Sequence, residues 1–94
     1  MDKKIEKLIF NTIDTVNSDL GIEIEKSRKS EIIGGASPLD SLGVISFLME
    51  LESNVENSLG IEITLVNDDV LSKDDNPLKN VGTIIDHLKH IIKS

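Results

Sequence analysis

The chain has no cysteine, no tryptophan, no tyrosine and only two phenylalanines among its 94 residues. The lack of cysteine excludes disulfide bonds, thiolate metal sites and cysteine nucleophiles. The scarcity of aromatic residues leaves little platform on which the bases of a nucleic acid could stack. It also predicts a core built almost entirely of aliphatic side chains.

Basic residues are also few, since ten Lys and Arg stand against seventeen Asp and Glu, for a formal net charge of −7. This charge disfavours binding to phosphate backbones and to anionic membranes. No apolar run reaches the length of a membrane span, and Met1–Lys7 lacks the apolar stretch of a signal peptide. We therefore expect a cytoplasmic, monomeric protein with no membrane span and no nucleic-acid partner.

Apolar residues make up 38% of the chain, enough for the core of one small domain over residues 1–94. They recur at helical spacing over residues 3–18 and 41–59 and again from Asn80 onward, and a short helical turn is predicted near Asp68–Leu71. No pair of strands is indicated. The expected fold is all-α, a small four-helix bundle of three main helices and one short helix, with a long first loop.

The boundaries of the predicted helices carry their own signals. Gly21 follows the first helix and Gly60 the second, and glycine readily adopts the left-handed conformation that ends a helix. Asp40 and Asn80 precede the second and last helices, where their side-chain oxygens can accept from free backbone N–H groups. Between the first two helices, we expect four isoleucines to attach the long loop to the core: Ile22, Ile24, Ile32 and Ile33.

The second helix carries two rows of apolar residues. One has the spacing of a core-facing stripe: Val44, Leu48, Leu51, Val55 and Leu59. The other lies about a quarter turn or more away and continues into acidic residues: Leu42, Ile45, Met49, Glu52 and Glu56. This second row either widens the buried face or forms an exposed docking patch, apolar near the helix start and acidic further along. Phe47 lies off both rows, and we expect the first loop to cover it.

The acidic residues are concentrated in the middle of the chain. Residues 41–75 contain eight Asp and Glu but a single base, Lys73. A face of this composition favours basic partners through electrostatic attraction. An acidic patch that only maintains solubility is the alternative.

A serine stands at the start of the second helix, directly after Asp40. The N–H groups and dipole of a helix N-terminus would accommodate a phosphate ester on Ser41. The residues Asp40-Ser41-Leu42-Gly43, heading an amphipathic helix in an acidic helical chain of this size, resemble the acyl carrier protein family. The similarity continues through Leu48–Glu52 and more loosely at Gly60–Ile63 and Asn80–Leu88, although only Asp-Ser-Leu is a sharp motif.

The resemblance implies a carrier and not an enzyme, with 4′-phosphopantetheine attached to Ser41 from coenzyme A by a phosphopantetheinyl transferase. The thiol of this group would hold an acyl chain as a thioester and present it to partner enzymes of fatty-acid or related lipid biosynthesis. Asp40 matches the aspartate that the transferase reads together with magnesium. The implied surface for partners with basic docking faces comprises residues of the second row: Leu42, Ile45, Met49, Glu52 and Glu56.

Departures from the family pattern leave alternatives open. Acidic residues of the familiar fatty-acid carriers are replaced here by Gly43, Ser46, Ser53 and Asn54, which indicates a dedicated set of partners. In having a glycine at position 43, the chain also resembles carriers of D-alanine in cell-wall modification, so an aminoacyl or D-alanyl cargo is one alternative. Another is an acidic helical interaction module without a prosthetic group, in which Ser41 only begins a helix. A hydrolase is a distant third, because Ser41 lacks the flanking glycines of a nucleophile elbow.

Two histidines of the last helix, His87 and His90, are spaced as two metal ligands could be. No third ligand is obvious beside them, so we expect a pair of surface histidines and no metal site. The sequence contains no recognisable catalytic constellation.

Overall fold

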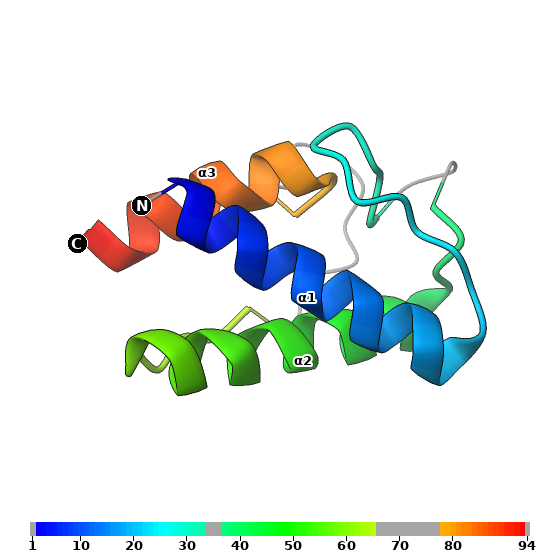
Figure 1. Ribbon diagram of the computed structural model, residues 1–94, viewed down its shortest axis with the longest axis horizontal. Helices are drawn as coiled ribbons and strands as arrows, with labels where there is room; N and C mark the ends of the chain where they lie inside the picture. Colours follow the sequence, from blue (N-terminus) through cyan, green and yellow to red (C-terminus); the bar gives the residue numbers. More distant parts are fainter. Residues whose placement is uncertain (1, 34–36, 66–77, 94) are drawn as a thin grey trace.

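The computed structural model describes residues 2–33, 37–65 and 78–93, and within these ranges it is all-helical, with three helices and no strand (Figure 1). The helices are α1 (Asp2–Leu20), α2 (Ser41–Leu59) and α3 (Val81–Lys93). The all-α prediction and the three main helices are confirmed. The short helix expected near Asp68–Leu71 lies outside the described residues.

Helix α1 is the central element, because it packs against both α2 and α3. It runs antiparallel to each of them, with α2 on one side and α3 on the other (Figure 1). The first turn of α1 and the last turn of α3 consequently lie at the same end of the molecule, and the start of α2 lies at the opposite end (Figure 1).

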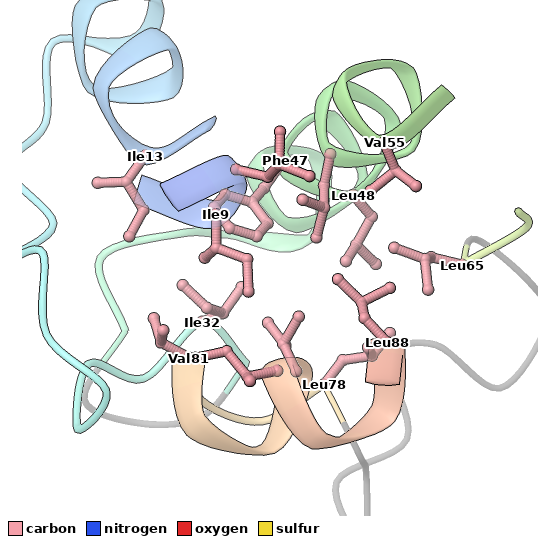
Figure 2. Close-up of a cluster of buried hydrophobic side chains, with 14 of the residues drawn as sticks. Ile9, Ile13, Ile32, Phe47, Leu48, Val55, Leu65, Leu78, Val81 and Leu88 are labelled. Atoms are coloured by element: carbon pink, nitrogen blue, oxygen red, sulfur yellow. The ribbon is translucent and has the colours of Figure 1, made fainter. Parts of the chain in front are cut away.

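The core is one cluster of aliphatic side chains with a single aromatic member, Phe47. Side chains of α1, α2 and α3 point toward one another in this cluster, and Ile32 of the first loop joins them (Figure 2). The predicted stripe of α2 faces it, with Val44, Leu48, Leu51 and Val55 buried. Phe47 is fully buried in the same cluster, so the buried face of α2 is wider than one row.

A buried polar contact joins α1 to α2 within this apolar core. The fully buried Thr12 hydroxyl donates to the carbonyl of Leu8 at 2.8 Å and accepts from the Asn54 side-chain amide at 2.8 Å. Because the hydroxyl has both a donor and an acceptor partner, its burial does not leave an unsatisfied polar group.

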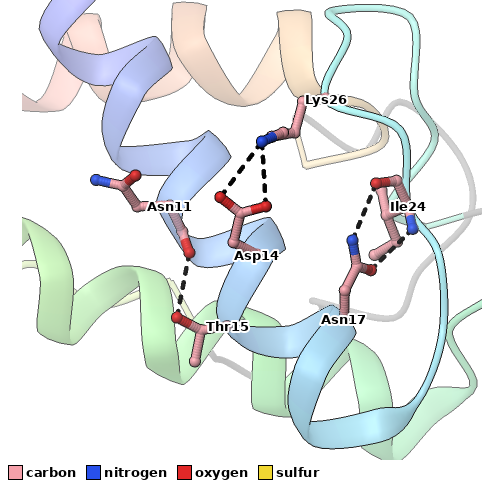
Figure 3. A network of polar contacts seen from close by, with 6 residues as sticks. All are labelled: Asn11, Asp14, Thr15, Asn17, Ile24 and Lys26. Carbon is pink, nitrogen blue, oxygen red and sulfur yellow. Dashed lines mark hydrogen bonds and ion pairs between the residues drawn. The ribbon is translucent and has the colours of Figure 1, made fainter.

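The connection from α1 to α2 is attached to the rest of the molecule along much of its length. Ile24, Ile32 and Ile33 are buried and Ile22 packs against the core, as predicted. The side-chain amide of Asn17 accepts from the N–H of Ile24 at 2.8 Å and donates to its carbonyl at 3.1 Å (Figure 3).

Two exposed ion pairs join this connection to α1. Lys26 contacts Asp14 at 3.2 Å (Figure 3), and Arg28 contacts Glu6 at 2.8 Å. Exposed pairs of this kind typically contribute about 1 kcal/mol or less to stability, so the buried isoleucines are the stronger attachment.

The same connection also supplies hydrogen-bond acceptors to α3. The carbonyls of Arg28 and Ser30 accept from the N–H groups of Gly82 and Val81, which have no acceptor within their own helix. Asn80 completes the cap as predicted, because its side-chain oxygen accepts from the Thr83 N–H at 2.9 Å while the Thr83 hydroxyl accepts from the Asn80 N–H at 3.1 Å.

None of the helices in residues 2–33, 37–65 and 78–93 combines the length and the apolarity needed to cross a membrane.

Candidate functional site

The start of α2 is held by Asp40, which has extended backbone geometry and a capping side chain. Its Oδ1 accepts from the Gly43 N–H at 2.7 Å, and its carbonyl accepts the first helical bond from Val44 at 2.9 Å. The predicted N-cap is confirmed.

The residues before Asp40 are also fixed. The Ser37 hydroxyl donates to the carbonyl of Ile32 at 2.7 Å and accepts from the N–H of Leu39 at 3.1 Å. This joins the entry to α2 to a residue of the core cluster. The backbone that presents Ser41 is therefore tied to the packed part of the molecule.

Gly43 allows the entry segment to lie close to the first turn of α2. A Cβ at this position would be 3.0 Å from Cδ2 of Leu39 and 3.2 Å from Oδ1 of Asp40, both tighter than ordinary van der Waals contacts. The lack of a side chain at Gly43 thus lets Leu39 and the capping carboxylate approach the helix. This packing accounts for a glycine at position 43 by itself, so the glycine is not evidence for a D-alanyl cargo.

Ser41 is the first residue of α2 and its side chain is exposed. Its hydroxyl has no hydrogen-bond partner among the described residues. The first turn of α2 contains no acidic residue, and the partial positive charge of the helix N-terminus favours a negative group on this hydroxyl, although the preceding residue, Asp40, carries a carboxylate. The N–H groups of Ser41 and Leu42 have no acceptor within the helix and could donate to an anion.

The second apolar row of α2 is divided by the fold. Leu42 and Met49 are 76% and 59% exposed, whereas Ile45 is half-buried. Widening of the buried face therefore does not account for Leu42 and Met49. Leu42 and Met49 thus form an exposed apolar surface on the same helix that begins with the exposed Ser41 hydroxyl.

The two acidic residues of this row have different surroundings. Glu52 is half-buried, and its carboxylate accepts from the backbone N–H of Leu65. It therefore helps to hold the segment that follows α2. Glu56 has an exposed side chain, and its carbonyl accepts from the N–H of Gly60, whose positive φ of 67° ends the helix as predicted.

His87 is half-buried on α3, and His90 is exposed one turn further on. Burial lowers the pKa of His87 from its ordinary value, and the charge of the nearby His90 lowers it further. Among the described residues, no group of three or more His, Asp or Glu side chains could hold a metal ion.

One exposed apolar residue was not anticipated from the sequence. Leu20, in the last turn of α1, is 46% exposed. Its only sequence signal is the spacing of four from Val16, which continues the apolar stripe of α1 beyond the predicted end at residue 18.

Comparison with known proteins gives no relative from which a role could be transferred, since no family model, curated protein or solved structure matches the chain.

Proposed function

We propose that the protein is a carrier whose Ser41 is the attachment site for 4′-phosphopantetheine. The observation that carries this proposal is an exposed serine hydroxyl at the N-terminus of α2, directly after a capping aspartate and beside the exposed Leu42. The same residues form the Asp-Ser-Leu motif that resembles the acyl carrier protein family. In this proposal the protein acts as a monomer in the cytoplasm and has no catalytic activity of its own.

The residues around Ser41 fit a phosphodiester on its hydroxyl. The hydroxyl is exposed, the first turn of α2 lacks acidic residues, and two N–H groups of that turn are available as donors. When bound, the prosthetic group supplies a terminal thiol that holds an acyl cargo as a thioester. The chain itself contributes a fixed helix start and a solvent-exposed point of attachment.

The proposed partners are a phosphopantetheinyl transferase and enzymes that load or receive the acyl group. Their docking surface would include the exposed Leu42 and Met49, the half-buried Ile45 and the acidic Glu52 and Glu56. Asp40 would be read by the transferase together with magnesium. Its Oδ1 is engaged with Gly43, but a carboxylate has further acceptor sites.

The test is the intact mass of the purified protein after incubation with coenzyme A and a broad-specificity transferase. The wild type should gain the mass of one phosphopantetheine group, and Ser41→Ala should gain none while its helical circular dichroism is unchanged. Ser58→Ala, another exposed serine of α2, is the matched control and should be modified like the wild type. Modification of Ser41→Ala would show that the attachment site is wrong.

A folded wild-type protein that gains no mass would instead favour an acidic interaction module. The exposure of Leu42 and Met49 supports this alternative too, because an apolar surface patch serves any protein partner. If modification occurs, an aminoacyl or D-alanyl cargo is distinguished from a fatty acyl cargo by which loading enzyme transfers its group to the thiol.

A further inference from the structure

A groove of about 400 Å³ lies between the C-terminal part of α1 and the middle of α2. Three residues from each helix line it: Val16, Asp19, Leu20, Ser46, Met49 and Glu50. On each helix the three have the spacing i, i+3, i+4, which places them on one face. The groove is therefore formed by two helix faces at the α1–α2 contact.

Each of the two helices contributes one exposed apolar side chain to this groove. Leu20 of α1 and Met49 of α2 are 46% and 59% exposed, and Val16 is buried between the helices. Leu20 and Met49 thus account for two of the three large apolar side chains that are exposed in the described part of the chain. A flexible Met beside a Leu can adapt to an inserted apolar side chain.

The polar part of the groove is acidic. Asp19 comes from the last turn of α1 and Glu50 from α2, and no basic residue is among the described residues that line the groove. The last turn of α1 also contains no basic residue, although the carbonyls at a helix C-terminus favour a cation. An acid at this end is unfavourable for the helix alone, and it adds to the negative potential at the groove.

We propose that this groove binds a basic amphipathic helix of a protein partner. An apolar side chain of that helix would sit between Leu20 and Met49, and a Lys or Arg would lie against Asp19 and Glu50. A second copy of this chain fits poorly, because the groove is acidic in each copy and the net charge is −7. The groove shares Met49 with the docking surface proposed above, but it requires no prosthetic group, so its occupant is tested separately from the carrier function.

The test uses the full chain and a synthetic helical peptide with leucine and lysine on one face. Amide shifts in ¹⁵N-labelled protein should change at the groove residues, with a dissociation constant that rises with salt. A second peptide, with glutamate in place of lysine, should not bind. Ser41→Ala protein should bind the basic peptide like the wild type, which separates this site from the carrier proposal.

Variants identify the contacts. Leu20→Ser should weaken binding about tenfold or more through the lost apolar contact, whereas Thr64→Ser, at an exposed residue outside the groove, should change it by less than about twofold. Asp19→Asn with Glu50→Gln should weaken binding about tenfold at low salt and less at high salt, unlike the control pair Glu23→Gln with Glu62→Gln, two exposed acids outside the groove.

The proposal is overturned if the peptide does not bind, or if its shift changes centre on residues other than those that line the groove. It is also overturned if the control variants weaken binding as much as the groove variants, because the peptide would then respond only to the overall negative charge. Circular dichroism of each variant verifies that the helices are retained.

Discussion

The carboxylate of Asp40 has a structural role at the start of α2 and a proposed recognition role beside Ser41. Oδ1 accepts from the Gly43 N–H, so the cap leaves the second oxygen for other donors. Capping requires an acceptor at this position, whereas reading by a transferase would require negative charge. Substitutions that separate the acceptor from the charge therefore separate the two roles.

We expect Asp40→Ala to lower the free energy of unfolding by about 1 kcal/mol, because it removes the N-cap of α2. Asp40→Asn should retain most of the stability, since asparagine is an equally good cap. Under the proposed function, the Asn variant should nevertheless be modified more slowly than the wild type. Urea unfolding followed by circular dichroism gives the stability, and the initial rate of mass gain gives the modification. Equal destabilisation by Asn and Ala would contradict the capping role.

His87 gives a second prediction, because its pKa is lowered by burial and by the charge of His90. Between this lower folded value and the ordinary histidine pKa, the unfolded chain binds more protons than the native protein. The free energy of unfolding contributed by His87 therefore rises with pH across that window and is lost as the pH falls through it.

The measurement is the urea midpoint of wild type and His87→Gln from about pH 7.5 to about pH 5.5. The wild type should lose more stability on acidification than the variant does. The acidic residues are the same in both proteins, so the difference between the two curves gives the contribution of His87 alone. Two parallel curves would show that burial of His87 has no effect on its protonation. His90→Gln is the control for the charge contribution, and it should raise the pKa of His87 seen by NMR.

Features that depend on neighbours in the chain could be predicted from the sequence, and features that depend on distant contacts could not. The caps at Asp40, Gly60 and Asn80 were predicted because each follows from the residue type and its place at a helix end. By contrast, the bond from Leu65 to Glu52 and that from Asn54 to Thr12 join residues whose proximity only the packing of the chain determines. The exposure of Ser41 likewise could not be predicted, although its place at a helix start could.

At the scale of elements, the connection between α1 and α2 links all three helices. It is anchored on α1 by Asn17, it supplies acceptors from Arg28 and Ser30 to the start of α3, and Ser37 fixes the entry to α2. The sequence predicts that four isoleucines attach this connection to the core. Over residues 22–33, the buried isoleucines and the backbone hydrogen bonds hold it against the helices, as that prediction requires.

The Asn17 contact can be tested by substitution within α1. Asn17→Ala removes two hydrogen bonds to Ile24, so we expect it to lower the free energy of unfolding by about 1–2 kcal/mol relative to Asn11→Ala. Asn11 is an exposed residue of the same helix, so the gain in helix propensity from alanine is similar at both positions. Faster hydrogen exchange at Ile24 in the Asn17 variant alone would locate the effect. Equal stabilities of the two variants would mean that the contact contributes little.

At the scale of the whole molecule, the net charge of −7 opposes compaction. The exposed pairs Lys26–Asp14 and Arg28–Glu6 neutralise acids of α1, but the exposed Glu56 and Glu62 stand in the part of the sequence with almost no bases. Repulsion between such exposed charges is screened by salt over a distance of about 10 Å at 0.1 M ionic strength.

We therefore expect the melting temperature to rise when sodium chloride is added to a low-salt buffer. Thermal unfolding by circular dichroism is the measurement, because the chain has no tryptophan or tyrosine to give a fluorescence signal. Sucrose at matched osmolality is the control for effects other than screening. A melting temperature that ignores salt would mean that the acidic residues are too far apart in the native state to repel one another.

The placement of the chain ends has a practical consequence for assays of the protein. The first turn of α1 and the last turn of α3 lie at one end of the molecule, and the start of α2, whose first residue is Ser41, lies at the other (Figure 1). A fusion partner or a biotinylated linker joined to either terminus would therefore sit far from the start of α2. Protein immobilised on a sensor chip through either linker should keep the start of α2 directed toward solution, so under the proposed function both linkers should allow a transferase to bind equally well.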